Sequence, residues 1–142
     1  MSDDLYQAEI IARARAGALD SRLDPHDVRT TIDNPLCGDR VTLDLRLAEG
    51  AVSALGHRTR GCALCQAASE TLRRCGVGAT GGIAQTGRAQ MQAYLTAAGT
   101  LDARWAAFDA FAPVRRHPSR HSCVLLPFDA LVDALSGTGR PT

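Results

Sequence analysis

Three cysteines and one aspartate stand in sequence surroundings suited to binding a metal ion. Cys37 lies two residues before Asp39 in the segment 34–39 (Asn-Pro-Leu-Cys-Gly-Asp), whose glycine lets the backbone turn so that both side chains face the same way. Cys62 lies where a strand is expected to give way to a helix, and Cys123 at the expected start of the last helix. The positive end of a helix favours the thiolate, which binds metal or takes up a persulfide sulfur. Three sulfurs and one carboxylate oxygen make a tetrahedral Zn²⁺ ligand set, or a labile iron–sulfur site.

A second interpretation of these cysteines stays open on spacing alone. The chain has five cysteines and no pair of CxxC motifs, and small buried cysteines are common in protein cores. Cys65 forms a single CxxC with Cys62 and is expected to pack, the alternative being a sulfur relay or an exchange of ligands. Cys75 is expected to be a plain thiol near a helix end.

Composition excludes several classes of function. All 16 basic residues are arginine, so the chain has neither a P-loop lysine nor a Schiff-base lysine. A formal charge of +1 gives no general attraction to nucleic acid or to an anionic membrane. No run approaches the ~20 apolar residues of a membrane span, and the start of the chain is acidic rather than typical of a signal peptide. We therefore expect a cytoplasmic protein with reduced thiols, in which five cysteines favour metal or catalysis over disulfides.

Alternating apolar residues predict a small antiparallel sheet. Residues 27–33 are rich in β-branched side chains, and 40–48 alternate cleanly with Val41, Leu43 and Leu45 on one face. A tight turn at 49–50 returns the chain as a third strand over 51–60.

Helical spacing predicts the remaining elements, which pack against this sheet in an α+β fold. A first helix, capped by Ser2 or Asp4, ends near Gly17, and the others are expected over 62–75, from Thr86 to about 99, over 103–111, and from Cys123 to 135. Segment 113–118 is expected to be extended, and the glycine-rich stretch 76–82 to be a flexible loop. We predict one domain over residues 1–136 and a disordered tail over 137–142.

The remaining candidates have plainer readings. His26 and His57 are expected at the surface, and Trp105 and Phe108, at helical spacing, in the core. His117 and His121 flank Cys123 and are candidates for hydrogen bonds to the residues that bind the metal.

Taken together, these residues resemble the U-type iron–sulfur cluster assembly family, which comprises IscU, SufU and the N-terminal module of NifU. The resemblance rests on the Asn-Pro-x-Cys-Gly-Asp motif at 34–39, on Gly61-Cys62-Ala63 before a small-residue helix, and on Cys123 opening the terminal helix. It extends from the first helix to about Leu135. The 61-residue separation of Cys62 from Cys123 and an arginine three residues before the last cysteine are similar to the SufU branch.

The resemblance implies a fold, a ligand set and a role. The fold is the SufE/IscU/NifU-like three-stranded antiparallel sheet against a bundle of helices, and the ligands are Cys37, Asp39, Cys62 and Cys123, holding Zn²⁺ or, alternatively, a [2Fe–2S] cluster on the three cysteines. Cys37 matches the acceptor of persulfide sulfur from a cysteine desulfurase of the SufS/IscS type, and Cys123 is the alternative acceptor, as in IscU. Arg120 is expected to steady Asp39 or a thiolate, unless it is simply a solvated arginine.

Two departures from the IscU pattern favour the SufU reading. Ser122 stands where IscU has a histidine directly before its last cysteine, and His121, one residue further away, is expected to point elsewhere. The IscU chaperone motif has only a loose echo in segment 112–115, so chaperone docking is not expected.

We therefore predict a zinc-binding sulfur acceptor rather than a stand-alone enzyme, which passes sulfur to a downstream iron–sulfur scaffold or to apo-proteins. The alternatives are a scaffold that assembles and transfers a [2Fe–2S] cluster, and a structural zinc protein that only mediates interactions.

Overall fold

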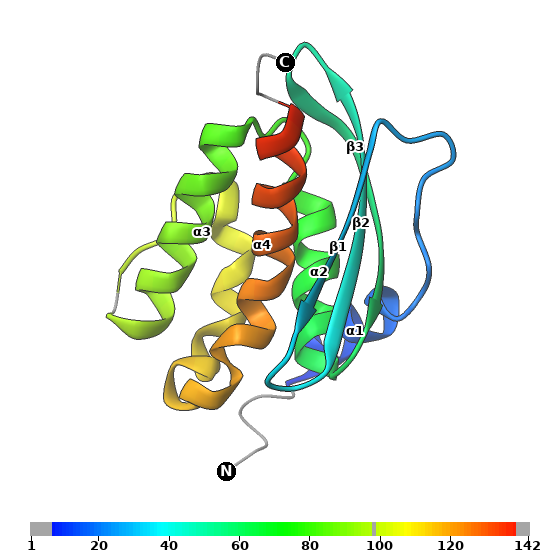
Figure 1. Ribbon diagram of the computed structural model, residues 1–142. Helices are drawn as coiled ribbons and strands as arrows, with labels where there is room; N and C mark the ends of the chain where they lie inside the picture. Colours follow the sequence, from blue (N-terminus) through cyan, green and yellow to red (C-terminus); the bar gives the residue numbers. More distant parts are fainter. Residues whose placement is uncertain (1–6, 98, 139–142) are drawn as a thin grey trace.

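A three-stranded antiparallel sheet forms one layer of the protein. The computed structural model describes residues 7–97 and 99–138. Strands β1 (Val28–Asn34), β2 (Asp39–Ala48) and β3 (Ala51–Arg60) are neighbours in that order, each within about one residue of the predicted bounds (Figure 1). This confirms the predicted α+β class and the predicted sheet.

Burial of alternate side chains explains why these segments are strands. Val41, Leu43 and Leu45 of β2 are at most 1% exposed and point toward the helices. The hairpin between β2 and β3 turns at Glu49 and Gly50, whose φ angles of 55° and 80° match the two left-handed positions of a type I′ turn.

Helices cover only one face of the sheet (Figure 1). Helices α2 (Ala63–Cys75) and α4 (His121–Thr138) lie against the strands, α3 (Gly81–Thr96) lies on the far side of α4, and α1 (Ala8–Gly17) runs against α2. Gly17 is required in that last contact, because a Cβ atom there would lie 2.0 Å from the carbonyl oxygen of Gln66. Among the described residues, no helix is long and apolar enough to cross a bilayer.

An aromatic cluster holds the helical layer together. Trp105 packs edge-on against Phe128 with ring centroids 5.2 Å apart, and Phe108 lies 4.8 Å from the same ring. All three side chains are at most 1% exposed. The prediction that Trp105 and Phe108 belong to the core is confirmed.

Two helical segments differ from their predicted form. Helix α3 begins at Gly81 rather than after Thr86, because the Thr80 hydroxyl accepts a hydrogen bond from the Ile83 N–H and caps the helix six residues earlier. The predicted flexible loop is shortened accordingly. Residues Ala103–Arg116 form the 3-10 helix η2, which continues as η3 (Pro118–Arg120), so the predicted extended segment 113–118 is wrong. Val114, 1% exposed, shows that this stretch packs into the core instead of crossing the surface.

The predicted ends of the chain are only partly described. Helix α4 continues to Thr138, two residues into the predicted tail, and begins at His121, so that Cys123 lies in its first turn. Helix α1 begins at Ala8 with Gln7 in the N-cap position, so the predicted capping by Ser2 or Asp4 is wrong. Ser2, Asp4 and the end of the tail, 139–142, lie outside the described residues.

His57 is buried, so its predicted surface position is wrong. A bulge opposite Arg46 and Leu47 inserts one residue into β3 and turns Leu55, His57 and Thr59 toward the helices. His57 Nδ1 lies 2.9 Å from Thr59 Oγ1, and its Nε2 lies 3.6 Å from Glu70 Oε1 on α2. His26 is exposed, as predicted.

The buried imidazole predicts a stability that falls in acid. Loss of hydration lowers the pKa of His57 below its ordinary value, although the Glu70 carboxylate acts against this and Arg73 adds to it. The unfolded chain therefore takes up a proton at its ordinary pKa, about 6.5, before the folded chain does. This contribution to stability is complete above about pH 6.5 and is lost below it. We expect the urea-unfolding free energy of His57→Gln to fall less between about pH 7 and about pH 5 than that of the native chain. Equal changes in the two proteins would contradict this.

Candidate metal site

The loop before β2 is fixed by its own asparagine. Asn34 is 5% exposed; its Oδ1 accepts the Leu36 N–H at 3.0 Å, and its Nδ2 donates to Ser122 Oγ on α4 at 2.9 Å. The Gly38 N–H donates to the Asn34 carbonyl at 2.8 Å, and Gly38 adopts a φ of 72° that favours glycine. The result is a tight loop tied to α4, with Cys37 exposed at its tip.

Asp39 connects this loop to the junction between β3 and α2. It is 2% exposed, and its Oδ1 accepts the backbone N–H of Cys62 at 3.0 Å. Its Oδ2 lies 3.0 Å from Cys37 Sγ and 3.6 Å from Cys62 Sγ. One oxygen therefore orients the carboxylate, and the other faces the thiols.

Helix starts position the two remaining sulfurs. Cys62 is the N-cap of α2, and its Sγ accepts the Cys65 N–H at 3.4 Å. Cys123 is fully buried, and its Sγ lies 3.7 Å from Cys37 Sγ. The structure thus brings all four predicted ligand residues to one place.

The distances among Cys37, Asp39 and Cys123 are close to those around a tetrahedral metal ion, whereas Cys62 Sγ lies near Asp39 but outside the group of donor atoms within 4.8 Å of one another. With Zn–S bonds of about 2.3 Å and a Zn–O bond of about 2.0 Å, ligand sulfurs lie about 3.8 Å apart and a sulfur lies about 3.5 Å from the oxygen. The observed separations are 3.7 Å for Cys37–Cys123, and 3.0 and 3.6 Å from Asp39 Oδ2 to two sulfurs. One donor atom each from Cys37, Asp39 and Cys123 lies within 4.8 Å of the others.

The thiols differ in how readily they ionise. A hydrogen bond from Cys123 lowers the pKa of Cys62 to about 7, and the same hydrogen bond, with burial, raises the pKa of Cys123. Lost hydration, and then Asp39, raise the pKa of Cys37. Without metal the group therefore holds one easily formed thiolate, Cys62, beside two thiols that retain their protons.

Cys65 and Cys75 are the two cysteines outside the predicted ligand set. Cys65 is fully buried, as its packing role predicts, and burial raises the pKa of its thiol. Cys75 donates its thiol hydrogen to the Thr71 carbonyl at 3.1 Å, and burial raises its pKa to about 11.

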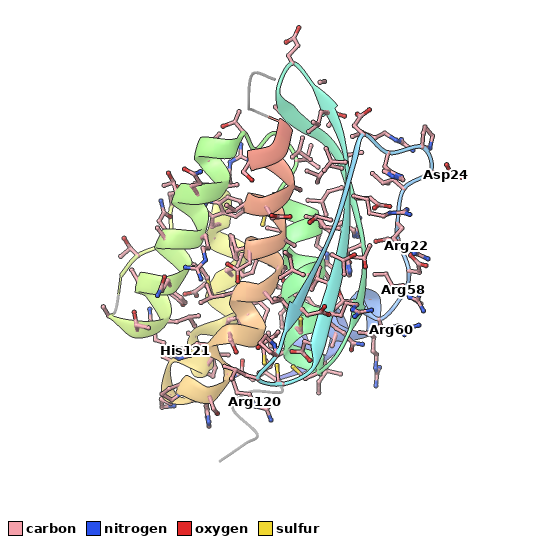
Figure 2. The ribbon with its side chains drawn as sticks, viewed as in Figure 1. Arg22, Asp24, Arg58, Arg60, Arg120 and His121 are labelled. Carbon is pink, nitrogen blue, oxygen red and sulfur yellow. The ribbon has the colours of Figure 1, made fainter. Side chains whose placement is uncertain are left out.

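The flanking histidine points away, as predicted. His121 Nε2 lies 3.0 Å from the carbonyl oxygen of Val114 in η2. Figure 2 shows Arg120 and His121 at the end of the molecule where α4 begins. The expected contact of Arg120 with Asp39 or a thiolate, and a role for His117, stay predictions.

The sequence did not predict the positioning roles of Asn34 and Gly61. The hydrogen bond from Asn34 to Ser122 joins residues 88 positions apart, and nothing in the sequence pairs them. Gly61 lies against Asp39 so closely that a Cβ atom would be 2.1 Å from Asp39 Oδ1. The Gly-Cys pair was visible in the sequence, but its reason was not.

Gly61→Ala should therefore damage the site more than the fold. The added methyl group would displace the Asp39 carboxylate, which loses its bond to the Cys62 N–H. We expect zinc affinity, measured by competition with a chelator, to fall about tenfold or more. Gly82→Ala is the control, since a Cβ there meets nothing within 4 Å. Unchanged affinity in Gly61→Ala would contradict the assigned role of Asp39.

Fold and site together define a small α+β domain with a thiol–carboxylate group that could hold a metal ion at one end of its sheet. A family model, the NifU-like N-terminal domain, matches residues 6–100. The chain belongs to this family, that is, to the U-type iron–sulfur assembly proteins.

Solved structures agree with this assignment. An N-terminal NifU-like protein from Brucella abortus is 33% identical, with a TM-score of 0.85 and 94% of each chain covered. A proposed iron–sulfur cluster assembly scaffold protein for the SUF system, from Fervidobacterium islandicum, is 22% identical, with a TM-score of 0.84, covering 95% of this chain and 99% of that one; it supports the fold alone. A comparison with curated protein sequences gave no match. The narrower placement in the SufU branch stays a prediction.

Proposed function

We propose that this chain is a zinc-binding sulfur acceptor, which takes persulfide sulfur from a cysteine desulfurase for iron–sulfur cluster assembly. The observation that supports it most is the meeting of three thiols and one carboxylate from three separate segments, with a single exposed thiol among them. Cys37, Asp39, Cys62 and Cys123 would hold the ion, which would keep the cysteines as thiolates.

Cys37 is the proposed acceptor because a partner can reach it. It is exposed on a loop tip beside Leu36, which is 87% exposed, whereas Cys123 is fully buried. Without metal the Cys37 thiol donates a hydrogen bond to Asp39 Oδ2 at 3.0 Å, and with zinc bound Cys37 would be a thiolate. The Cys37 thiolate then attacks the outer sulfur of the donor persulfide; the donor S–S bond breaks, a new S–S bond forms on Cys37, and the donor cysteine leaves as a thiolate.

The surroundings of Cys123 favour zinc over an iron–sulfur cluster. Ser122, at the position of the IscU histidine, accepts a hydrogen bond from Asn34, and His121 is turned toward Val114. A [2Fe–2S] scaffold is the second candidate, because three thiols and a carboxylate also supply four ligands for two irons. A purely structural zinc module is the third candidate, and it predicts no persulfide on any cysteine.

Loss of single ligands should separate these functions. With its desulfurase, the native chain should raise cysteine turnover and gain mass corresponding to one sulfur on Cys37. Asp39→Ala, Cys62→Ser and Cys123→Ser should lose the stimulation almost completely, because each breaks the ligand set. Cys75→Ser is the matched control, since that thiol bonds the Thr71 carbonyl. Circular dichroism should confirm that each variant is folded. Full stimulation by folded Cys62→Ser would contradict the proposal, and sulfur found on Cys123 alone would move the acceptor role there.

Zinc affinity should rise with pH. The raised pKa values of Cys37 and Cys123 mean that zinc must displace protons from both thiols. We expect the apparent affinity to increase at least about tenfold from about pH 6 to about pH 7. Calorimetry in buffers of different ionisation enthalpy would count the protons released. An affinity independent of pH would exclude these thiols as ligands.

A further inference from the structure

Four arginines gather on the face of the sheet that no helix covers. Arg22, Arg40, Arg58 and Arg60, with Thr42, line a shallow cavity of about 150 Å³, and we call these five residues the arginine surface. In Figure 2, Arg22, Arg58 and Arg60 lie along the side of the sheet opposite the helices.

Strand register brings these side chains together. Arg40 of β2 is directly opposite Arg60 of β3, and Thr42 is directly opposite Arg58. Like charges at such opposed positions destabilise a sheet. The packing of the domain does not require these arginines, because their side chains lie on the face of the sheet opposite the core.

The charges are only partly neutralised. Arg40 pairs with Asp33, and Arg22 pairs with Asp20, whose pKa Arg58 also helps to lower. Within residues 7–97 and 99–138, neither Arg58 nor Arg60 forms an ion pair. Four guanidinium groups against two carboxylates leave a net charge of +2 at this surface.

The open part of this face is the part beside the metal site. Segment 19–27 covers the other part: the Ser21 N–H donates to the His57 carbonyl at 2.9 Å, and the Leu23 N–H donates to Asp44 Oδ2 at 2.9 Å. Arg40 follows the ligand Asp39 directly, and Arg60 stands two residues before the ligand Cys62. A partner bound to the arginine surface would therefore lie next to the loop of Cys37.

We propose that the arginine surface docks an acidic segment of the protein that delivers sulfur to Cys37. This inference rests on the proposed function. Arg58 and Arg60 lie two residues apart on the same face of β3, so two carboxylates of one extended segment can each meet a guanidinium group. A face spread over two strands and a loop, open to solvent, suits such a segment better than a single small anion. Rim charges of this kind act mainly on the rate of encounter and on its salt dependence.

The test measures how much of the chain half-saturates the stimulation of its cysteine desulfurase. For the double variant Arg58→Gln/Arg60→Gln we expect this concentration to rise about tenfold at low salt, with the maximal stimulation unchanged. Added sodium chloride should raise the half-saturating concentration of the native chain more than that of the double variant. Arg88→Gln is the single-charge control, to be compared with Arg58→Gln and Arg60→Gln singly, because Arg88 pairs with Asp129 on the helical side of the molecule.

Further readouts separate this proposal from its alternatives. Zinc content should stay native in the double variant, and its melting temperature should stay equal or rise, since the opposed Arg40–Arg60 pair is relieved. An unchanged half-saturating concentration would overturn the docking proposal while leaving sulfur acceptance intact. A native chain that forms dimers which the double variant loses would assign the surface to a second copy. Thermal stabilisation by inorganic phosphate, lost in the double variant without any effect on half-saturation, would assign it to a small anion. If no variant and not even the native chain stimulates the desulfurase, the proposed function itself fails.

Discussion

The site depends on how the Asp39 carboxylate is held. Its Oδ1 is fixed by the backbone N–H of Cys62, and this leaves Oδ2 between the sulfurs of Cys37 and Cys62. Gly61 has no side chain and so leaves space for this contact. The start of β2 and the end of β3 are thereby joined through one side chain, and Cys62, the residue before α2, both caps that helix and places its sulfur near the carboxylate.

The same arrangement explains why the group suits a cation. A carboxylate and three sulfurs crowded into a largely buried space repel one another when ionised, and the metal-free chain limits this by keeping protons on Cys37 and Cys123. A divalent ion removes the need for those protons, because its charge stabilises the thiolates. Cys37 lies on an exposed loop, so its sulfur can react with a sulfur donor without disturbing the core.

Much of the fold could be predicted from the sequence, and so could the proximity of Cys37, Asp39, Cys62 and Cys123, because both follow local rules. Alternating apolar residues predicted the strands, a glycine-containing turn predicted the hairpin, and the motif 34–39 indicated candidate ligands. The exceptions depended on contacts or on local irregularities: Thr80, rather than Thr86, caps α3, and a bulge in β3 turns His57 inward. Long-range contacts such as Asn34–Ser122, and the gathering of arginines from β2, β3 and the 19–27 segment, need the register of the sheet and cannot be read from spacing.

The most direct test of this account is the metal content of the protein, purified without oxygen and measured together with its visible absorption spectrum. The account predicts about one zinc per chain and a colourless protein. Iron with acid-labile sulfide and a visible absorption band would contradict it, and would make the chain a cluster scaffold on the same four residues.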